Sequence, residues 1–300
     1  MMKKELGFVG LGRMGLAMTT RLVEQGYTVV GYDPTVSAQA AAAAVGVKVT
    51  PDISTLTATL GDAKVIWLMV PSSLVDTVLA ELLPLLNSGD TVIDGGNSFY
   101  KDSVRRHDTL AEQGIVSLDV GTSGGVTGAR HGASLMVGGS PEAFTAVEPL
   151  LRDLATRGGY ARVGTAGAGH FVKMIHNGIE YGMMGAIAEG VAVLHDHKAQ
   201  FGIDLPEVFK PYEHESIISS KLVSWLSEAF KQGQIENIKG EVPVGETEFE
   251  MEHITTLGEV LVLKAALAQR KQSREQASYL GKLVAAMRNQ FGGHKVIDTM

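Results

Sequence analysis

The chain has 300 residues, 45% of them hydrophobic and 20% charged, which is enough apolar material for one large domain or two ordinary ones. Its formal net charge of −7 argues against a broad surface for nucleic acid or for an anionic membrane. The absence of cysteine excludes disulfides, thiolate metal sites and a cysteine nucleophile. The basic start MMKKELGFVGLG has too short an apolar part for a signal peptide, and no run of about 18 apolar residues predicts a membrane span. We therefore expect a cytoplasmic protein.

Short apolar runs alternate with helical segments from Leu6 to about Val163. The expected strands are LGFVG, TVVGYD, KVIWLMVP, DTVIDGG, VSLDVG and SLMVGG. The expected helices between them are residues 14–25, 37–44, 74–86, 101–113 and 141–155. Strands that alternate with helices predict right-handed crossovers and a mostly parallel, doubly wound sheet.

The pattern changes after Gly164, where the strand signals stop. Long helical patterns cover residues 168–197, 206–231 and 252–290, and residues 239–248 are expected to form a loop. The sequence therefore predicts an α/β domain at residues 1–165, followed by an all-α domain at residues 166–300.

A glycine motif follows the first expected strand directly. Gly10, Gly12 and Gly15 form a G-x-G-x-x-G that opens a helix, which is the arrangement of a Rossmann-type dinucleotide site. Asp33 ends the second expected strand, where a carboxylate can accept both ribose hydroxyls and repels a 2′-phosphate. No arginine lies between Asp33 and Ala40, so we expect NAD rather than NADP. The alternative is that the glycines only make a tight turn and Asp33 caps the next helix.

The segment GHFVKMIHNGIEYG, residues 169–182, has an unusual polar face. Lys173, His176, Asn177, Glu180 and Tyr181 fall on one side of a helix, because helical neighbours recur at three and four residues. A buried lysine can act as a base and a glutamate in apolar surroundings can act as an acid. Spacing alone leaves two interpretations open: a catalytic face, or a solvated or interface face.

This segment resembles the helix that carries the catalytic lysine in the 6-phosphogluconate dehydrogenases. IDGGNS at residues 93–98 resembles the family's nicotinamide-side segment, and VGTSGGVTGAR at residues 120–130 resembles its substrate loop. MRNQFGGH at residues 287–294 resembles the C-terminal segment of its short members. In the wider group of β-hydroxyacid dehydrogenases, many 3-hydroxyisobutyrate dehydrogenases have Lys-x-x-Asn-Asn at the lysine, whereas this chain has His176 and Glu180 as in the phosphogluconate branch.

The resemblance implies an oxidative decarboxylation that needs no metal. Lys173 would take the proton of the substrate's C3 hydroxyl as hydride passes to NAD, and the 3-keto acid would then lose CO2. Glu180 would protonate C1 of the enediol to give ribulose 5-phosphate, while His176 and Asn177 hydrogen-bond the substrate. We assign to the cofactor site Gly10, Leu11, Gly12, Arg13, Met14, Gly15, Asp33, Val70 and Asn97, and to the substrate site Asn97, Ser123, Gly124, Gly125, Tyr181, Arg270, Arg288 and His294.

The resemblance also implies a homodimer or homotetramer, in which the helical domain binds substrate and dimerises and the C-terminal segment reaches the neighbouring subunit's site. It places the enzyme in the pentose phosphate pathway or gluconate metabolism. Without the resemblance, Arg270 and Arg288 would be interpreted as solvated helix charges.

One segment departs from the family. Its members usually carry Gly-x-Gly-Lys/Arg-Trp-Thr for the phosphate, whereas GETEFEM at residues 245–251 places Glu248 and Glu250 at the positions of the base and the threonine. Carboxylates repel a phosphate dianion. Three alternatives therefore stay open: a decarboxylating dehydrogenase for another sugar acid, a non-decarboxylating β-hydroxyacid dehydrogenase or semialdehyde reductase, and a non-catalytic NAD-binding sensor.

Overall fold

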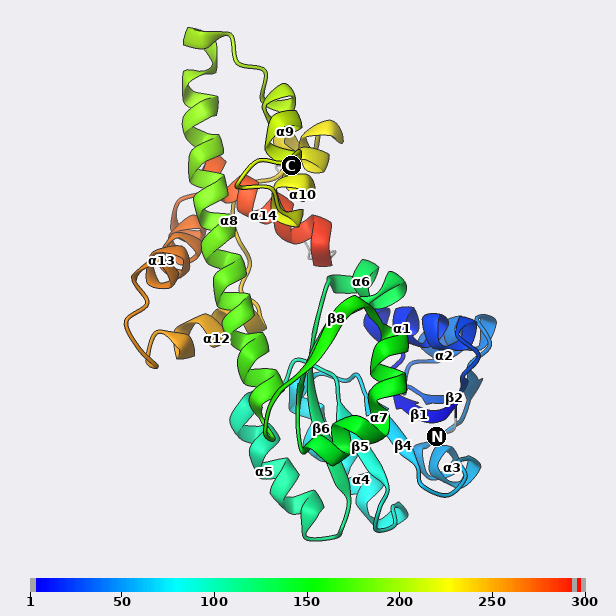
Figure 1. The fold of residues 1–300 in the computed structure, drawn as a ribbon. Helices are drawn as coiled ribbons and strands as arrows, with labels where there is room; N and C mark the ends of the chain where they lie inside the picture. The colour runs from blue at the N-terminus through cyan, green and yellow to red at the C-terminus, as the bar shows by residue number, and fades with distance from the viewer. Residues whose placement is uncertain (1–3, 293–295, 298–300) are drawn as a thin grey trace. The chain divides into compact units, whose positions relative to one another are not determined.

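A computed structural model describes residues 4–292 and 296–297 of the chain. It divides the chain into two compact units, Met1–Lys173 and Met174–Met300. Figure 1 shows strands only in the first of these units, so each unit is considered by itself below.

The described part of the first unit is built on one eight-stranded sheet with the strand order β3-β2-β1-β4-β5-β6-β7-β8. All neighbouring strands are parallel except β6 and β7, which pair antiparallel. The order reverses at β1 and β4, which is where the carboxyl ends of a doubly wound sheet form a ligand crevice. The strands are β1 Glu5–Val9, β2 Thr28–Tyr32, β3 Lys48–Val49, β4 Val65–Leu68, β5 Thr91–Asp94, β6 Val116–Ser123, β7 Ala133–Gly138 and β8 Ala155–Gly164.

Helices cover both faces of this sheet, which explains why a strand such as β4, with the sequence VIWL, is buried along its whole length. One apolar cluster joins the sheet to α1, α2, α6 and α7, and a second joins its other face to α3, α4 and α5. These helices are α1 Arg13–Glu24, α2 Val36–Ala44, α3 Ile53–Thr59, α4 Val75–Leu82, α5 Tyr100–Ala111, α6 Gly125–His131 and α7 Pro141–Leu154, with short 3₁₀ turns at Ser72–Leu74 and Leu83–Leu85.

The second unit is helical and has its own apolar core, to which Met184, Phe209, Leu226 and Leu283 contribute. Helix α8, Ala168–Phe201, begins before the end of the first unit and is the longest of the described helices. The remaining helices are α9 Leu205–Glu213, α10 Lys221–Lys231, α11 Gln234–Asn237, α12 Glu246–Ile254, α13 Leu261–Glu275 and α14 Tyr279–Gly292. None of the described helices is long and apolar enough to cross a membrane.

The predicted fold class, a Rossmann-type α/β domain followed by a helical domain, is confirmed. Several local expectations were wrong. The pattern at residues 206–231 is two helices, because the Ser220 hydroxyl accepts the backbone N–H of Val223 and starts α10 anew. The pattern at residues 252–290 is likewise interrupted, and the expected loop at 239–248 becomes helical at Glu246.

The sequence did not predict β8, an edge strand that contains Gly158 and Gly159 and whose residues are mostly exposed or half-buried. Its glycines resemble a turn, and its register with β7 is irregular. The short elements β3, α3 and α6 were also not predicted.

Candidate active site

The glycine turn lies between β1 and α1. Gly10 has φ +96°, a conformation that favours glycine, and a side chain at Gly15 would collide with the Gly10 carbonyl. Gly12 is the N-cap of α1, and a Cβ placed on it would meet no atom within 4 Å. The backbone at Gly12 is therefore open to a ligand at a helix N-terminus, which suits a pyrophosphate.

Asp33 lies at the carboxyl end of β2 and is 8% exposed. Its Oδ2 accepts the backbone N–H of Leu11 at 2.8 Å, and its Oδ1 accepts that of Thr35 at 2.8 Å. Thr35, and not Asp33, is the N-cap of α2, so the capping alternative is wrong. The carboxylate is fixed beside the glycine turn and keeps lone pairs for ribose hydroxyls.

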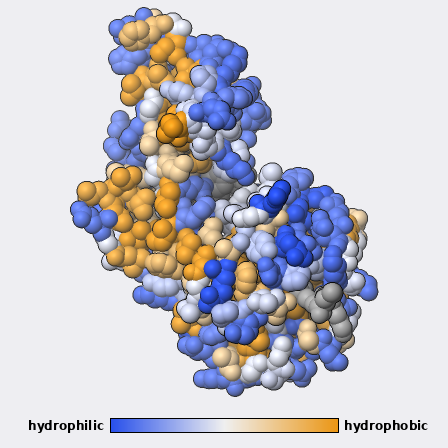
Figure 2. Space-filling model, viewed as in Figure 1, coloured by the Kyte–Doolittle hydropathy of each residue, from blue (hydrophilic) through white to orange (hydrophobic). Residues whose placement is uncertain are grey.

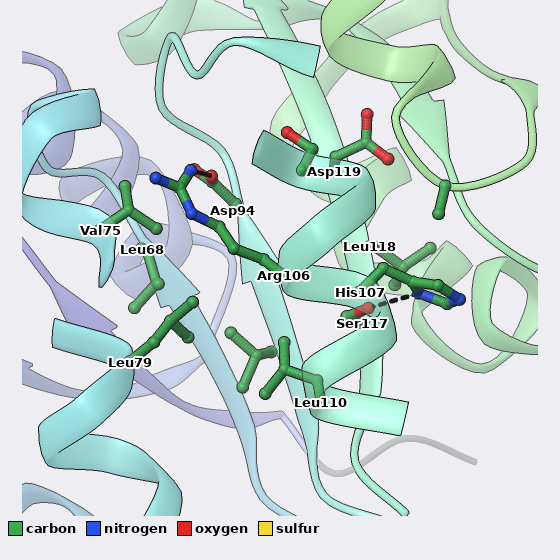
Figure 3. Close-up of a pocket in the computed structure, with 13 residues that line it drawn as sticks. Leu68, Val75, Leu79, Asp94, Arg106, His107, Leu110, Ser117, Leu118 and Asp119 are labelled. Carbon is green, nitrogen blue, oxygen red and sulfur yellow. Dashed lines mark hydrogen bonds and ion pairs between the residues drawn. The ribbon is translucent and has the colours of Figure 1, made fainter. Parts of the chain in front are cut away.

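Arg106 on α5 joins the two loops that follow β4 and β5, and it is 6% exposed. Its Nε donates to Asp76 at the start of α4 at 2.8 Å, its Nη2 donates to the Ser72 carbonyl at 3.3 Å, and its Nη1 donates to Ser98 at 3.3 Å. Nη1 also lies 3.6 Å from Asp94, as Figure 3 shows. Ser98 in turn donates to Asp94 at 2.6 Å. The hydrogen bond from Arg106 is the main reason that the pKa of Asp76 falls to about 2. Arg106 thus fixes the segment that contains Asn97.

Val70 and Asn97 lie in these two loops. The loops come close together, since a Cβ on Gly96 would lie 2.9 Å from the Val70 carbonyl oxygen. The cavity in Figure 3, lined by Leu79, Leu110 and Arg106 among others, is about 20 Å³. It can hold about one water molecule, so it is too small for a sugar acid or a nucleotide.

Ser123, Gly124 and Gly125 form the turn from β6 into α6, with φ +112° at Gly124 and +61° at Gly125. Lys173 lies against the same strand, because a side chain at Gly121 would collide with the Lys173 Cβ. The structure therefore brings Lys173 to β6 two residues before Ser123.

In the second unit, α8 carries His176, Asn177 and Glu180. The His176 Nδ1 lies 3.8 Å from the Glu180 carboxylate and 3.3 Å from the Asn177 Oδ1. Asn177 is 5% exposed, and its side-chain amide donates a hydrogen bond to the Glu250 carboxylate at 2.7 Å. Glu250, one of the two departures from the family, is therefore a direct partner of a predicted site residue.

Tyr181, Arg270 and Arg288 form a buried cluster, with exposed fractions of 4%, 2% and 4%. Arg288 Nε donates to the Tyr181 hydroxyl at 2.9 Å, and the Arg270 guanidinium lies 4.8 Å from the centre of the Tyr181 ring. Both arginines also donate to the Pro243 carbonyl. The interpretation of Arg270 and Arg288 as solvated charges, made from the helical pattern alone, is therefore wrong.

Glu248, the second departure from the family, is 5% exposed, and its negative charge is paired with arginines. Arg274 donates two hydrogen bonds to its carboxylate, at 2.9 and 2.7 Å, and the Arg270 Nε lies 3.2 Å away. Burial lowers the pKa of Arg270. Among the described residues no carboxylate pairs with Arg288, so the cluster has three guanidinium groups for one carboxylate.

Some site residues were missed by the sequence reasoning. Arg274 could have been found, since it lies four residues after Arg270 on the same helix face. Thr247, which donates to the Tyr181 hydroxyl at 3.1 Å, and Arg106 carried no sequence signal. His294 lies outside the described residues. No group of three or more acidic or histidine side chains that could hold a metal occurs in the part of the chain that the structure describes.

The sequence matches the models of two domains of one family, over adjoining ranges. Residues 5–167 match the NAD binding domain of 6-phosphogluconate dehydrogenase, and residues 169–244 match the 6-phosphogluconate dehydrogenase C-terminal domain. A solved structure of Plasmodium falciparum 6-phosphogluconate dehydrogenase, described in apo form and with NADP+ and 6-phosphogluconate, is similar with a TM-score of 0.79 and 28% identity. That match covers 90% of this chain and 62% of the other.

Two curated relatives match over nearly their whole length. The "Putative 6-phosphogluconate dehydrogenase YqeC" of Bacillus subtilis is 43% identical, over 97% of this chain and 98% of its own. The "6-phosphogluconate dehydrogenase, NAD(+)-dependent, decarboxylating" of Haloferax volcanii is 37% identical over the same shares. With its glycine turn, its lysine helix and both halves matched, the chain belongs to the 6-phosphogluconate dehydrogenase family of oxidoreductases.

Proposed function

We propose that the chain oxidises and decarboxylates 6-phosphogluconate to ribulose 5-phosphate and CO2, with NAD as the hydride acceptor. The observation that carries this proposal is the buried cluster around Tyr181. Arg270, Arg274 and Arg288 carry three positive charges there against the one carboxylate of Glu248, a surplus of two. A buried surplus of positive charge is costly unless an anion fills it, and a phosphate dianion supplies two charges and the acceptors for arginine.

The chemistry begins at Lys173. In its neutral form the amine takes the proton of the C3 hydroxyl while the hydride leaves C3, which makes a 3-keto acid. The resulting ammonium donates a hydrogen bond to the C3 oxygen as the C1–C2 bond breaks and CO2 departs, so it stabilises the developing enolate. NAD, when bound, supplies the hydride acceptor.

Glu180 completes the reaction by giving its proton to the carbon that was C2 of the substrate and becomes C1 of ribulose 5-phosphate. His176 lies 3.8 Å from Glu180 and orients its carboxyl group, while Asn177, held by Glu250, donates or accepts at a sugar hydroxyl. Ser123 and Asn97 would bind the substrate's carboxylate and hydroxyls at the strand ends. His294 is proposed to contribute to the phosphate end.

NAD is proposed as the preferred cofactor, held by the glycine turn, Arg13, Val70 and Asn97. Asp33 supports this preference, because its fixed carboxylate suits a ribose diol and repels the 2′-phosphate of NADP. The Haloferax volcanii relative is named an NAD(+)-dependent enzyme, which agrees with the proposal.

We further propose a homodimer or homotetramer that works in the cytoplasm, in gluconate metabolism or the pentose phosphate pathway. Exposed apolar side chains on α8, α12 and α13 support self-association: Ile179, Met183, Phe249, Leu261 and Val262. The area over α12 and α13 is visibly apolar in Figure 2.

The test is an activity panel of 6-phosphogluconate and gluconate, each with NAD and with NADP. We expect NADH, CO2 and pentulose phosphate in equal amounts, formed fastest with 6-phosphogluconate and NAD. A 3-keto acid or semialdehyde without CO2 would favour a non-decarboxylating dehydrogenase, and preferred turnover of gluconate would favour another sugar acid. If a broader set of aldonates gives no turnover while NAD still binds, the chain is a sensor and the proposal fails.

A further inference from the structure

We propose that Asp119 is the positioning residue for Lys173: its side chain caps helix α8 and holds the lysine against strand β6. The inference rests on the proposed function, because it takes Lys173 as the base. It concerns only residues of the first unit.

Asp119 is 5% exposed and lies within β6, far along the sequence from the helix that it caps. Its Oδ1 accepts the backbone N–H of Gly167 at 2.7 Å, and its Oδ2 accepts that of His170 at 2.9 Å. The first N–H groups of a helix have no partner within the helix, so a carboxylate here satisfies two groups that otherwise lack one. The negative charge also lies at the positive end of the helix.

Glycines on both sides of the contact let the first turn of α8 pack directly against β6 and β7, where there is no room for a side chain. A side chain at Gly169 would collide with the Asp119 and Met136 carbonyl oxygens, and one at Gly138 would collide with the Asp119 carboxylate. A side chain at Gly121 would collide with the Lys173 Cβ. Gly169 and Lys173 are one helical turn apart, so the position of the first turn sets the position of the lysine.

His170, one of the two residues that Asp119 caps, also connects the start of α8 to α5. Its Nδ1 lies 2.7 Å from the Ser103 hydroxyl of α5, and its residue is 2% exposed. Phe171 also packs edge-on against Tyr100, at the start of α5, with ring centres 5.0 Å apart. Since α5 follows the segment of Asn97 directly, the Asp119 cap fixes the lysine relative to both β6 and that segment.

The chain offers a matched control in Asp90. This carboxylate is 2% exposed and also accepts two backbone N–H groups, from Lys64 and Asn87, each at 2.8 Å. It precedes β5, at the amino ends of the parallel strands, whereas Ser123 and Asp94 mark the carboxyl ends. Asp90 therefore matches Asp119 in burial and in its two backbone N–H bonds, but not in its relation to Lys173. It also pairs with the Lys64 ammonium at 3.4 Å, so Asp90→Asn should cost at least as much stability as Asp119→Asn.

The experiment compares Asp119→Asn with Asp90→Asn. We expect both to lower the melting temperature, because each puts an amide where a carboxylate accepted two N–H groups. Only Asp119→Asn should lower kcat, by about 100-fold, since a displacement of about 1 Å at a reacting group has that effect. The KM for NAD should not change in either variant. An unchanged kcat in Asp119→Asn, or an equal loss of kcat in Asp90→Asn, overturns the proposal.

Two further measurements separate this proposal from the proposed function. Hydrogen exchange of the amides at residues 167–173 should be faster in Asp119→Asn and unchanged in Asp90→Asn, whatever substrate the enzyme uses. Unchanged exchange overturns the cap even if the wild type is inactive on the panel. Should Asp119→Asn not fold, Gly121→Ala keeps the Asp119 carboxylate but pushes on the Lys173 Cβ and on the Gly169 carbonyl oxygen, and so displaces the lysine. It should lower kcat with unchanged KM for NAD, and a wild-type kcat there overturns the proposal.

Discussion

Glu248 decides how many positive charges remain for a substrate. It neutralises Arg274 with two hydrogen bonds and lies 3.2 Å from the Arg270 Nε, whereas Arg288 bonds only uncharged oxygens among the described residues. In the sequence, Glu248 stands where the family has a base for the phosphate. In the structure its negative charge is paired with Arg270 and Arg274. Among the described residues no carboxylate balances the charge of Arg288, so this guanidinium is the one that an incoming anion would neutralise.

Arg288→Met should weaken phosphate binding selectively. A hydrogen bond to a charged group contributes about 1.5–3 kcal/mol, so the KM for 6-phosphogluconate should rise about 10- to 100-fold. The KM for gluconate should stay close to its wild-type value, because gluconate has no group for the cluster. The control is Arg152→Met, whose side chain is 62% exposed. Equal increases of KM for both substrates would show that the cluster is structural.

Lys173→Met should remove turnover and keep cofactor binding. Methionine preserves the length of the side chain but cannot take the C3 proton, so kcat should fall to near zero while titration with NADH gives the wild-type Kd. Lys198→Met is the matched control, since Lys198 is exposed on the same helix and should not affect kcat. Substantial turnover in Lys173→Met would refute the role of the lysine as base.

At the scale of the elements, Arg106 connects α5 with the loops after β4 and β5. Its bond to Asp76 is testable by NMR titration. In Arg106→Met the pKa of Asp76 should rise from about 2 toward its ordinary value of 3.8. It should rise less in Arg105→Met, because Arg106 makes the largest contribution.

The sign of the accompanying stability change follows from this lowered pKa. A depressed carboxyl pKa stabilises the fold above the unfolded value, and this stabilisation disappears as the pH falls from about 4 to about 2. The wild type should thus lose more stability than Arg106→Met across that window, measured by urea unfolding. Because Asp76 is half exposed, the difference should be small. Equal losses in both proteins would contradict the linkage.

The elements that the sequence predicted are those with local causes. Helix α8, the glycine turn and the central strands follow from periodicity and from glycine chemistry within a few residues. The breaks between α9 and α10 and after α12 depend on capping and packing that apolar spacing does not record. The edge strand β8 depends on pairing with β7.

The same distinction holds in the site. Asp33 and Lys173 could be predicted because each stands in a local motif, whereas the burial of Arg270 and Arg288 depends on Tyr181, about 90 residues or more earlier in the chain. Asp119 likewise gave no signal, since a single aspartate in a strand does not reveal the helix that it caps.

At the scale of the whole molecule, the exposed apolar side chains of the helical unit are the feature to explain. Leu261 and Val262 at the start of α13 are 69% and 68% exposed, and Phe249 on α12 is 66% exposed. Contiguous exposed apolar surface is rare on monomers, and Figure 2 shows it over α12 and α13. A second copy of the chain would bury it, which agrees with the proposed homodimer or homotetramer.

Analytical ultracentrifugation should therefore give two or four times the chain mass of 31.8 kDa. Leu261→Asp places a charge on the apolar surface, and burial of an unpaired carboxylate opposes association, so the mass should shift toward the monomer as the protein is diluted. Val36→Asp is the control, because Val36 is 77% exposed on α2 of the other unit and its change should leave the mass as it is. A wild-type protein that sediments at the mass of one chain would contradict the proposed assembly. A Leu261→Asp protein as large as the wild type would place the interface on another surface.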